Sequence, residues 1–83
     1  MSNAVEDLRK EIEALIKEHG FHPDKVDCKE YPPSPVGEKI VDYTVYLPST
    51  EREDYANDHF DSDRKDVKKR GKELGLTARL YYE

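Results

Sequence analysis

The apolar residues of this chain follow two different spacings, one typical of a helix and one typical of a strand. One glycine ends the helical segment, and another glycine precedes the strand segment. Before Gly20, apolar residues recur every three or four positions, which is the spacing of one face of a helix. These residues are Val5, Leu8, Ile12, Leu15 and Ile16. After Gly75, apolar and polar residues alternate, which is the spacing of a half-buried strand. A chain that holds both periods belongs to the α+β class.

Glycines and prolines place the boundaries of the first three elements. The helical period predicts a first helix over Val5–His19, which Gly20 ends. Alternation and β-branched residues predict strands over Val26–Tyr31 and Lys39–Leu47. The segment between them, residues 32–37, is rich in proline and cannot continue a ladder because proline has no amide donor. We therefore expect a hairpin with a long loop.

The second half of the chain predicts a short helix and a longer helix, followed by a strand. Residues 49–61 are acidic and contain the capping-box pattern Thr50-x-x-Glu53, which suits one short helix. Ser62 is a candidate N-cap for a longer helix that runs to about Leu74. The alternating segment Leu76–Tyr82 then predicts a third strand.

The order helix, strand, strand, helix, strand predicts a small two-layer sandwich. Its two helices would cover one face of a three-stranded, mainly antiparallel sheet. An internal similarity aligns residues 9–12 and 17–21 with residues 64–67 and 72–76. A duplicated helix-strand unit of this kind is similar to a ferredoxin-like arrangement that lacks its first strand. The alternative is that two amphipathic helices ended by glycine share these residues by chance.

The length of 83 residues favours one domain with a modest core. Such a chain buries only roughly 60 to 65 per cent of its unfolded surface, so a deep catalytic cavity is not expected. Charged residues make up 40% of the chain, yet six tyrosines and two phenylalanines separate it from disordered sequences. Residues 1–4 resemble the remnant of a cleaved expression tag, and we assign residues 5–83 to the domain.

The single cysteine, Cys28, predicts an intracellular, cytoplasmic protein, since it has no partner for an intramolecular disulfide and no secretory signal is evident. No apolar run approaches the roughly 18 residues of a membrane-spanning helix, so we expect no membrane partner.

The sheet face turned away from the helices is the first candidate surface. If the buried residues of each strand point toward the helices, one tyrosine of each strand points the other way. The predicted surface consists of Lys29, Tyr31, Tyr46, Arg79 and Tyr81. Aromatic rings flanked by cations can contact a protein partner or stack on bases. The structural alternative is that tyrosine is simply a favourable residue for a half-exposed strand position.

A basic run on the predicted second helix is the other candidate surface. Its cations are Arg64, Lys65, Lys68, Lys69, Arg70 and Lys72. With Asp66 they give a local charge of +5, whereas the whole chain carries −5. This asymmetry could steer a phosphate backbone or an acidic protein to the helix, or it could be a solvated face balanced by the neighbouring acidic segment.

Metal binding and catalysis have no comparable support. His19, His22 and Cys28 lie within ten residues, and His59 lies between two aspartates, but the spacing fits no zinc or calcium signature. No phosphate-binding glycine loop and no serine elbow is present. We expect no enzyme activity, no metal and no cofactor, and Cys28 to be a small buried residue.

These features predict a non-catalytic protein-interaction or self-assembly module, for which a homodimer is plausible because edge strands leave backbone groups unpaired. The alternative is a nucleic-acid-binding module that uses the tyrosine-bearing face and the basic helix.

Overall fold

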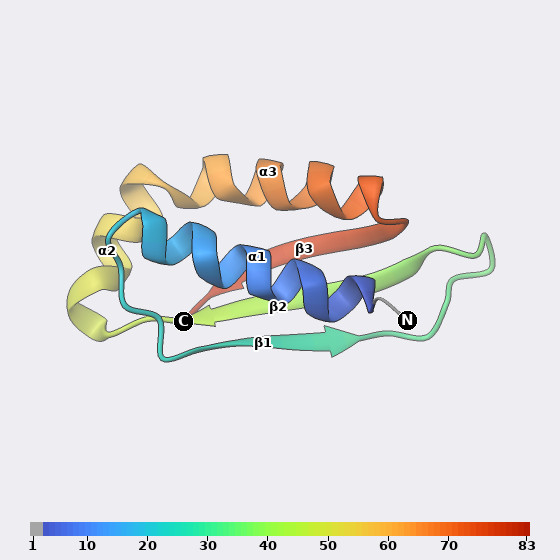
Figure 1. Cartoon of the computed structure of the whole chain (residues 1–83), viewed down its shortest axis with the longest axis horizontal. Helices are drawn as coiled ribbons and strands as arrows, with labels where there is room; N and C mark the ends of the chain where they lie inside the picture. The colour runs from blue at the N-terminus through green and yellow to red at the C-terminus, as the bar shows by residue number, and fades with distance from the viewer. Residues whose placement is uncertain (1–2) are drawn as a thin grey trace.

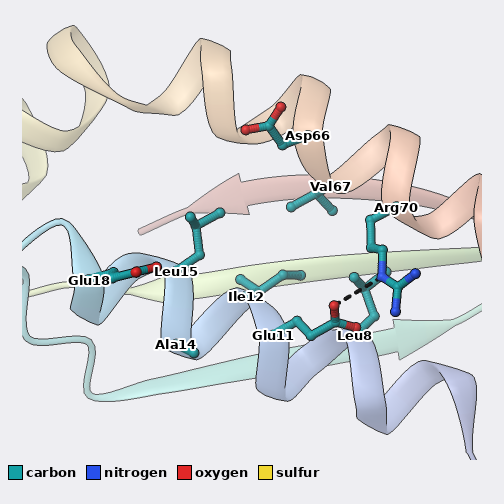
Figure 2. A pocket seen from close by; sticks show the side chains of 9 residues that line it. All are labelled: Leu8, Glu11, Ile12, Ala14, Leu15, Glu18, Asp66, Val67 and Arg70. Carbon is teal, nitrogen blue, oxygen red and sulfur yellow. Dashed lines mark hydrogen bonds and ion pairs between the residues drawn. The ribbon is translucent and has the colours of Figure 1, made fainter.

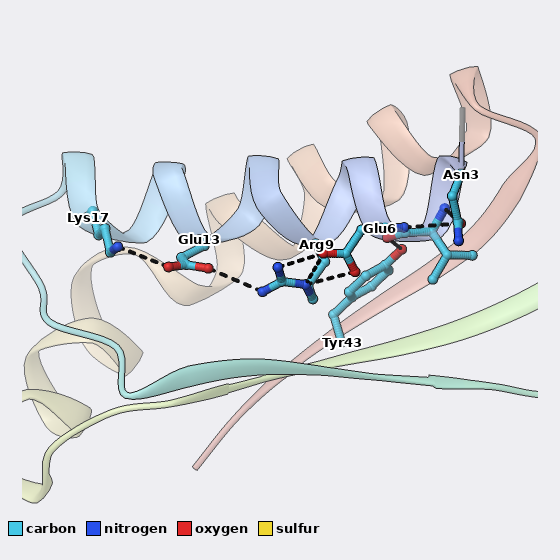
Figure 3. A network of polar contacts seen from close by, with 7 residues as sticks. Asn3, Glu6, Arg9, Glu13, Lys17 and Tyr43 are labelled. Atoms are coloured by element: carbon cyan, nitrogen blue, oxygen red, sulfur yellow. Dashed lines mark hydrogen bonds and ion pairs between the residues drawn. The ribbon is translucent and has the colours of Figure 1, made fainter. Parts of the chain in front are cut away.

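Three helices and three strands follow one another in the order α-β-β-α-α-β (Figure 1). The computed structural model describes residues 3–83. The elements are α1 (Ala4–Glu18), β1 (Lys25–Glu30), β2 (Lys39–Tyr46), α2 (Ser49–Asp58), α3 (Phe60–Glu73) and β3 (Leu76–Tyr82). Helices α1 and α3 lie on the same side of the sheet, and α2 lies at its end (Figures 1 and 3). The predicted α+β class and two-layer architecture are confirmed, although α2 is a third helix that the predicted order of helix, strand, strand, helix, strand did not include.

The sheet has the order β1-β2-β3 and is mixed. Strands β1 and β2 form the predicted long-looped antiparallel hairpin, with Val26 opposite Val45. Strands β2 and β3 are parallel, with Val41 beside Ala78. The sheet is therefore less antiparallel than we expected, because α2 and α3 carry the chain back to the start of β2 before β3 begins. A helix precedes both β1 and β3, as the internal similarity predicts.

Helix α1 is anchored at both ends and to the sheet (Figure 3). The Asn3 side chain accepts hydrogen bonds from the amides of the first turn, and Gly20 follows the helix with a φ of 94°. The Tyr43 hydroxyl, buried under α1, donates to the Val5 carbonyl at 2.8 Å. Burial raises the pKa of Tyr43 well above its ordinary value, so this donor stays protonated.

The core lies between the sheet and the two long helices. Its apolar members are Val5, Leu8, Ile12, Ile16, Val26, Val41, Tyr43, Val45, Leu47, Tyr55, Val67, Leu76, Ala78 and Leu80. In β2 and β3, the residues that face the core are those that the alternation in the sequence predicts. Cys28 is an exception, since it is exposed although it lies opposite the buried Tyr43. Strand β1 is an edge strand, which leaves Cys28 exposed, so the prediction of a buried cysteine was wrong.

Helices α2 and α3 begin earlier than the capping patterns predict. The residues that precede α2 and α3 are Pro48 and His59, and neither makes a side-chain capping hydrogen bond. Thr50 and Ser62 lie inside these helices and do not have the predicted capping role. The ring of Phe60 packs edge-to-face on Tyr82 with centroids 4.7 Å apart. This contact fixes the start of α3 two residues before Ser62. No helix in the described range, residues 3–83, is long and apolar enough to cross a membrane.

Candidate protein-interaction surface

The sheet face opposite the helices carries a hydrogen-bonded network centred on Asp42. The Tyr31 hydroxyl donates to Asp42 Oδ2 at 2.9 Å, and Arg79 Nη2 donates to the same oxygen at 3.0 Å. Burial opposes ionisation of Asp42, but these two donors outweigh it and hold the pKa of the carboxyl below its ordinary value. The predicted surface therefore contains a carboxylate that the sequence interpretation did not include, and this carboxylate neutralises Arg79.

Lysine and arginine side chains of the protein itself already contact most of the tyrosine rings on this face. Lys29 Nζ lies 5.1 Å from the centroid of Tyr31, and the Arg79 guanidinium lies 5.5 Å from it. Lys25 Nζ lies 4.7 Å from the centroid of Tyr46. Contacts of this kind hold the rings in place without any partner. Tyr81 differs from the other two, since it is 45% exposed.

The six cations of the basic run point to different neighbours because a helix distributes consecutive residues around its axis. Arg70 faces α1, where it pairs with Glu11 at 3.0 Å, and it also pairs with Glu73. Lys69 is not among the residues that line the two hollows between α3 and β3. The remaining four cations, Arg64, Lys65, Lys68 and Lys72, lie along the flank of α3 that borders β3. The structure thus divides the predicted basic surface.

A groove joins part of each predicted surface. It has a volume of about 630 Å³ and runs between α3 and β3. It is lined by Phe60, Arg64, Lys65, Lys68, Thr77, Ala78, Arg79, Leu80 and Tyr81. A second hollow of about 400 Å³ shares Lys68 and Thr77 with it and extends past Lys72 to Leu76. Together they follow β3 along its length, and we call them the edge groove. Lys29, Tyr31 and Tyr46 lie outside it.

The edge groove borders the free edge of β3. Strand β3 has β2 on one side only, and α3 runs beside it at the top of Figure 1. Glu83, directly after β3, donates to the Val45 carbonyl at 2.8 Å and accepts from the Leu47 amide at 2.7 Å, so its backbone faces β2. Backbone groups alternate sides along a strand. The amides and carbonyls of Ala78, Leu80 and Tyr82 therefore point away from β2.

The end of the edge near α3's C-terminus is tightly packed. A Cβ on Gly71 would lie 2.6 Å from the Ala78 Cβ and 3.4 Å from the Ala78 amide nitrogen. The absence of a side chain at Gly71 therefore lets α3 approach β3 closely here. Further along, no backbone hydrogen bond within residues 3–83 links Leu80 or Tyr82 to an element outside the sheet. The outward backbone groups of Ala78 and Leu80 are nevertheless covered, since these two residues are only 2% and 1% exposed.

A crevice between α1 and α3 lies away from this edge (Figure 2). It has a volume of about 310 Å³, and Leu8, Ile12, Leu15 and Val67 form its apolar floor. The Arg70–Glu11 ion pair bridges the two helices at one end (Figure 2). Its floor belongs largely to the core, and the crevice presents no convergent polar groups beyond the charged side chains at its rim.

The histidines and acids gather around Asp63 rather than around a metal position. Asp63 is only 2% exposed, and its carboxylate lies 3.0 Å from both His19 Nε2 and the Tyr55 hydroxyl. The ring of His59 stacks on that of His19 with centroids 4.1 Å apart. No group of three or more His, Cys, Asp and Glu residues in the described range is placed to hold a metal ion. Sequence reasoning missed Asp63, because its position at the start of a helix is typical of an exposed acid.

Comparisons with known proteins found no match to this chain among protein-family models, curated proteins or solved structures.

Proposed function

We propose that this chain is a non-catalytic protein-interaction module that binds a segment of another protein in the edge groove. The observation that carries the proposal is the lining of this groove, where the half-exposed ring of Tyr81 shares the groove with Phe60 and with the cations Arg64, Lys65 and Lys68. Aromatic side chains and arginine are enriched where proteins contact one another.

The edge groove is a better candidate for the binding site than the open sheet face. On the open face, Asp42 already engages Tyr31 and Arg79, and a partner would have to break these contacts. In the edge groove, Tyr81 is half exposed and Phe60 is partly exposed. An exposed aromatic side chain in a groove is a typical contact of a protein partner.

A nucleic-acid-binding function is the second candidate, and the four cations along the groove favour it. Arg64, Lys65, Lys68 and Lys72 could neutralise phosphates, and Tyr81 could stack on a base. Two observations weigh against it. The chain carries a net charge of −5, and the Tyr31 ring is flanked by its own cations.

Selection from a library of random displayed nonapeptides, followed by amide shift mapping on the labelled protein, tests the proposal. We expect selected peptides to shift the amides of Lys65, Lys68 and Tyr81, because the side chains of these residues line the groove. Selected peptides that shift only α1 or α2, or a library that yields no binder, would overturn it. Sedimentation of the protein alone would reveal whether a second copy occupies the groove.

A further inference from the structure

We infer that the segment bound in the edge groove is helix α2 of a second copy of this chain, so that copies associate head to tail. This inference rests on the proposed function and names the partner. It follows from two oppositely charged surfaces that the fold leaves unpaired, from their matching spacing, and from their separate places on the molecule.

The edge groove concentrates positive charge. Its exposed cations on α3 are Arg64, Lys65, Lys68 and Lys72. None of these four forms an ion pair within residues 3–83, whereas Arg70 on the α1 side of the same helix pairs with Glu11 and Glu73. The described residues that line the larger hollow of the groove include no carboxylate. An acidic surface would therefore meet a positive potential along this flank of α3.

Helix α2 presents the complementary charge. The helical period places three exposed carboxylates on one side of α2, which we call the acidic face: Glu53, Asp54 and Asp58. Within residues 3–83 they form no ion pair, whereas Glu51 of the same helix accepts a hydrogen bond from the His22 amide at 2.7 Å. The one cation of α2, Arg52, donates to the Leu47 carbonyl at 3.1 Å. The acidic face is thus free to pair with cations of another molecule.

The acidic face and the edge groove have the same spacing of charge, because both are built on helices. Asp54 and Asp58 are four residues apart, as are Arg64, Lys68 and Lys72. Four residues of helix rise about 6 Å. When α2 of one copy lies along α3 of the next, two neighbouring carboxylates therefore come beside two neighbouring cations in a single register. Neither helix has to change its backbone to form these ion pairs.

The two surfaces occupy different parts of the molecule. Helix α2 lies at one end of the sheet, and α3 runs away from it beside β3 (Figure 1). Contact between two different surfaces is heterologous, so each copy keeps one surface free for a further copy, and the assembly continues as a chain or closes as a ring. Symmetric contacts are disfavoured, because two cationic flanks or two acidic faces would repel each other.

Sedimentation equilibrium of the full chain over a range of protein concentrations tests this inference. Exposed ion pairs are individually weak and are screened by salt. We therefore expect the weight-average mass to rise with protein concentration at low ionic strength, and the rise to shrink when salt is added. In the same concentration series, the amides of Asp54, Asp58, Lys65 and Lys68 should shift in NMR spectra of the labelled protein.

Charge-reversal variants locate the contact. Lys68→Glu and Lys69→Glu form a matched pair, since both reverse one exposed charge on α3, and only Lys68 is among the residues that line the groove. We expect Lys68→Glu to weaken association about fivefold or more, and Lys69→Glu less than about twofold. Asp54→Lys should weaken association as Lys68→Glu does. An equimolar mixture of Asp54→Lys and Lys68→Glu should associate again, because the intact α2 of one variant meets the intact groove of the other. Mixing would not rescue variants that had failed to fold.

The outcomes separate this inference from the proposed function. Association that is lost in Lys68→Glu and recovered in the mixture supports both. A chain that stays monomeric at low salt, while library peptides shift Lys65 and Lys68, overturns the second copy and leaves the proposed function standing. Association that Lys68→Glu leaves unchanged also overturns the inference. If neither peptides nor a second copy shift the groove, the proposed function fails as well. A single-stranded oligonucleotide that binds the monomer and loses affinity in Lys68→Glu would assign the groove to nucleic acid and overturn both.

Discussion

The Tyr55 hydroxyl donates a hydrogen bond of 3.0 Å to Asp63 Oδ2, and both side chains are almost completely buried. Burial and the neighbouring carboxylate raise the pKa of Tyr55 well above its ordinary value, so the hydroxyl stays protonated and remains a donor. His19 Nε2 contacts the other carboxylate oxygen. One buried acid therefore links the end of α1 to α2 and to the start of α3.

Tyr55→Phe tests the contribution of this link to stability. The substitution keeps the ring but leaves Asp63 Oδ2 buried without its donor, which costs about 1–3 kcal/mol. We expect the free energy of unfolding, measured by urea denaturation, to fall by that amount. Tyr81→Phe is the control, because the Tyr81 side chain is 45% exposed and its hydroxyl makes no hydrogen bond within residues 3–83, and we expect a change within about 0.5 kcal/mol. Equal effects of the two variants would contradict the buried link.

Gly71→Ala tests the close approach of α3 to β3. Alanine gains roughly 1 kcal/mol of helix propensity over glycine, but its Cβ would lie 2.6 Å from that of Ala78, which is fixed to the backbone of a strand. Overpacking of this kind costs about 1–3 kcal/mol, so we expect a net loss of stability in thermal or urea unfolding. In an Ala78→Gly background the same substitution should cost less. An unchanged cost in that background would show that the two residues do not interact.

The pH dependence of stability tests the Asp42 network. The pKa of Asp42 is lower in the folded chain than its ordinary value of 3.8. Its stabilising contribution is therefore present above pH 3.8 and is lost as the pH falls through the lower, folded-state pKa. We expect Asp42→Asn to flatten the acid limb of the curve of unfolding free energy against pH. Asp54→Asn, which removes an exposed carboxylate that has no side-chain partner within residues 3–83, should leave that limb unchanged.

The reactivity of Cys28 tests its position on the exposed edge strand. Burial and the carboxylates of Glu6 and Glu30 raise the pKa of this thiol. Less thiolate is then present at neutral pH, so iodoacetamide should alkylate the folded protein more slowly than the urea-unfolded protein. The rate for the folded protein should also reach its midpoint at a higher pH. Equal rates and equal midpoints for the two states would contradict the raised pKa.

Much of the fold follows from local patterns in the sequence. The helical period before Gly20 and the alternation after Gly75 depend on which residues face a core, and any compact structure must satisfy them. The elements at residues 4–18, 39–46 and 76–82 were therefore predictable to within two residues. The starts of α2 and α3 were not, because tertiary contacts such as that of Phe60 with Tyr82 outweigh the capping preferences of Thr50 and Ser62.

The candidate surfaces also combine features that the sequence determines with features that only the fold decides. The sequence by itself determined the composition of the basic run and the alternation that exposes Arg79 and Tyr81. Only the tertiary structure decided that Arg79 and Tyr81 meet Lys65 and Lys68 in one groove. The physical reason is that parallel pairing of β2 and β3 is a long-range choice, made by the path of the chain through α2 and α3 and by the packing of Gly71 on Ala78. No local pattern records which edge of a sheet stays free.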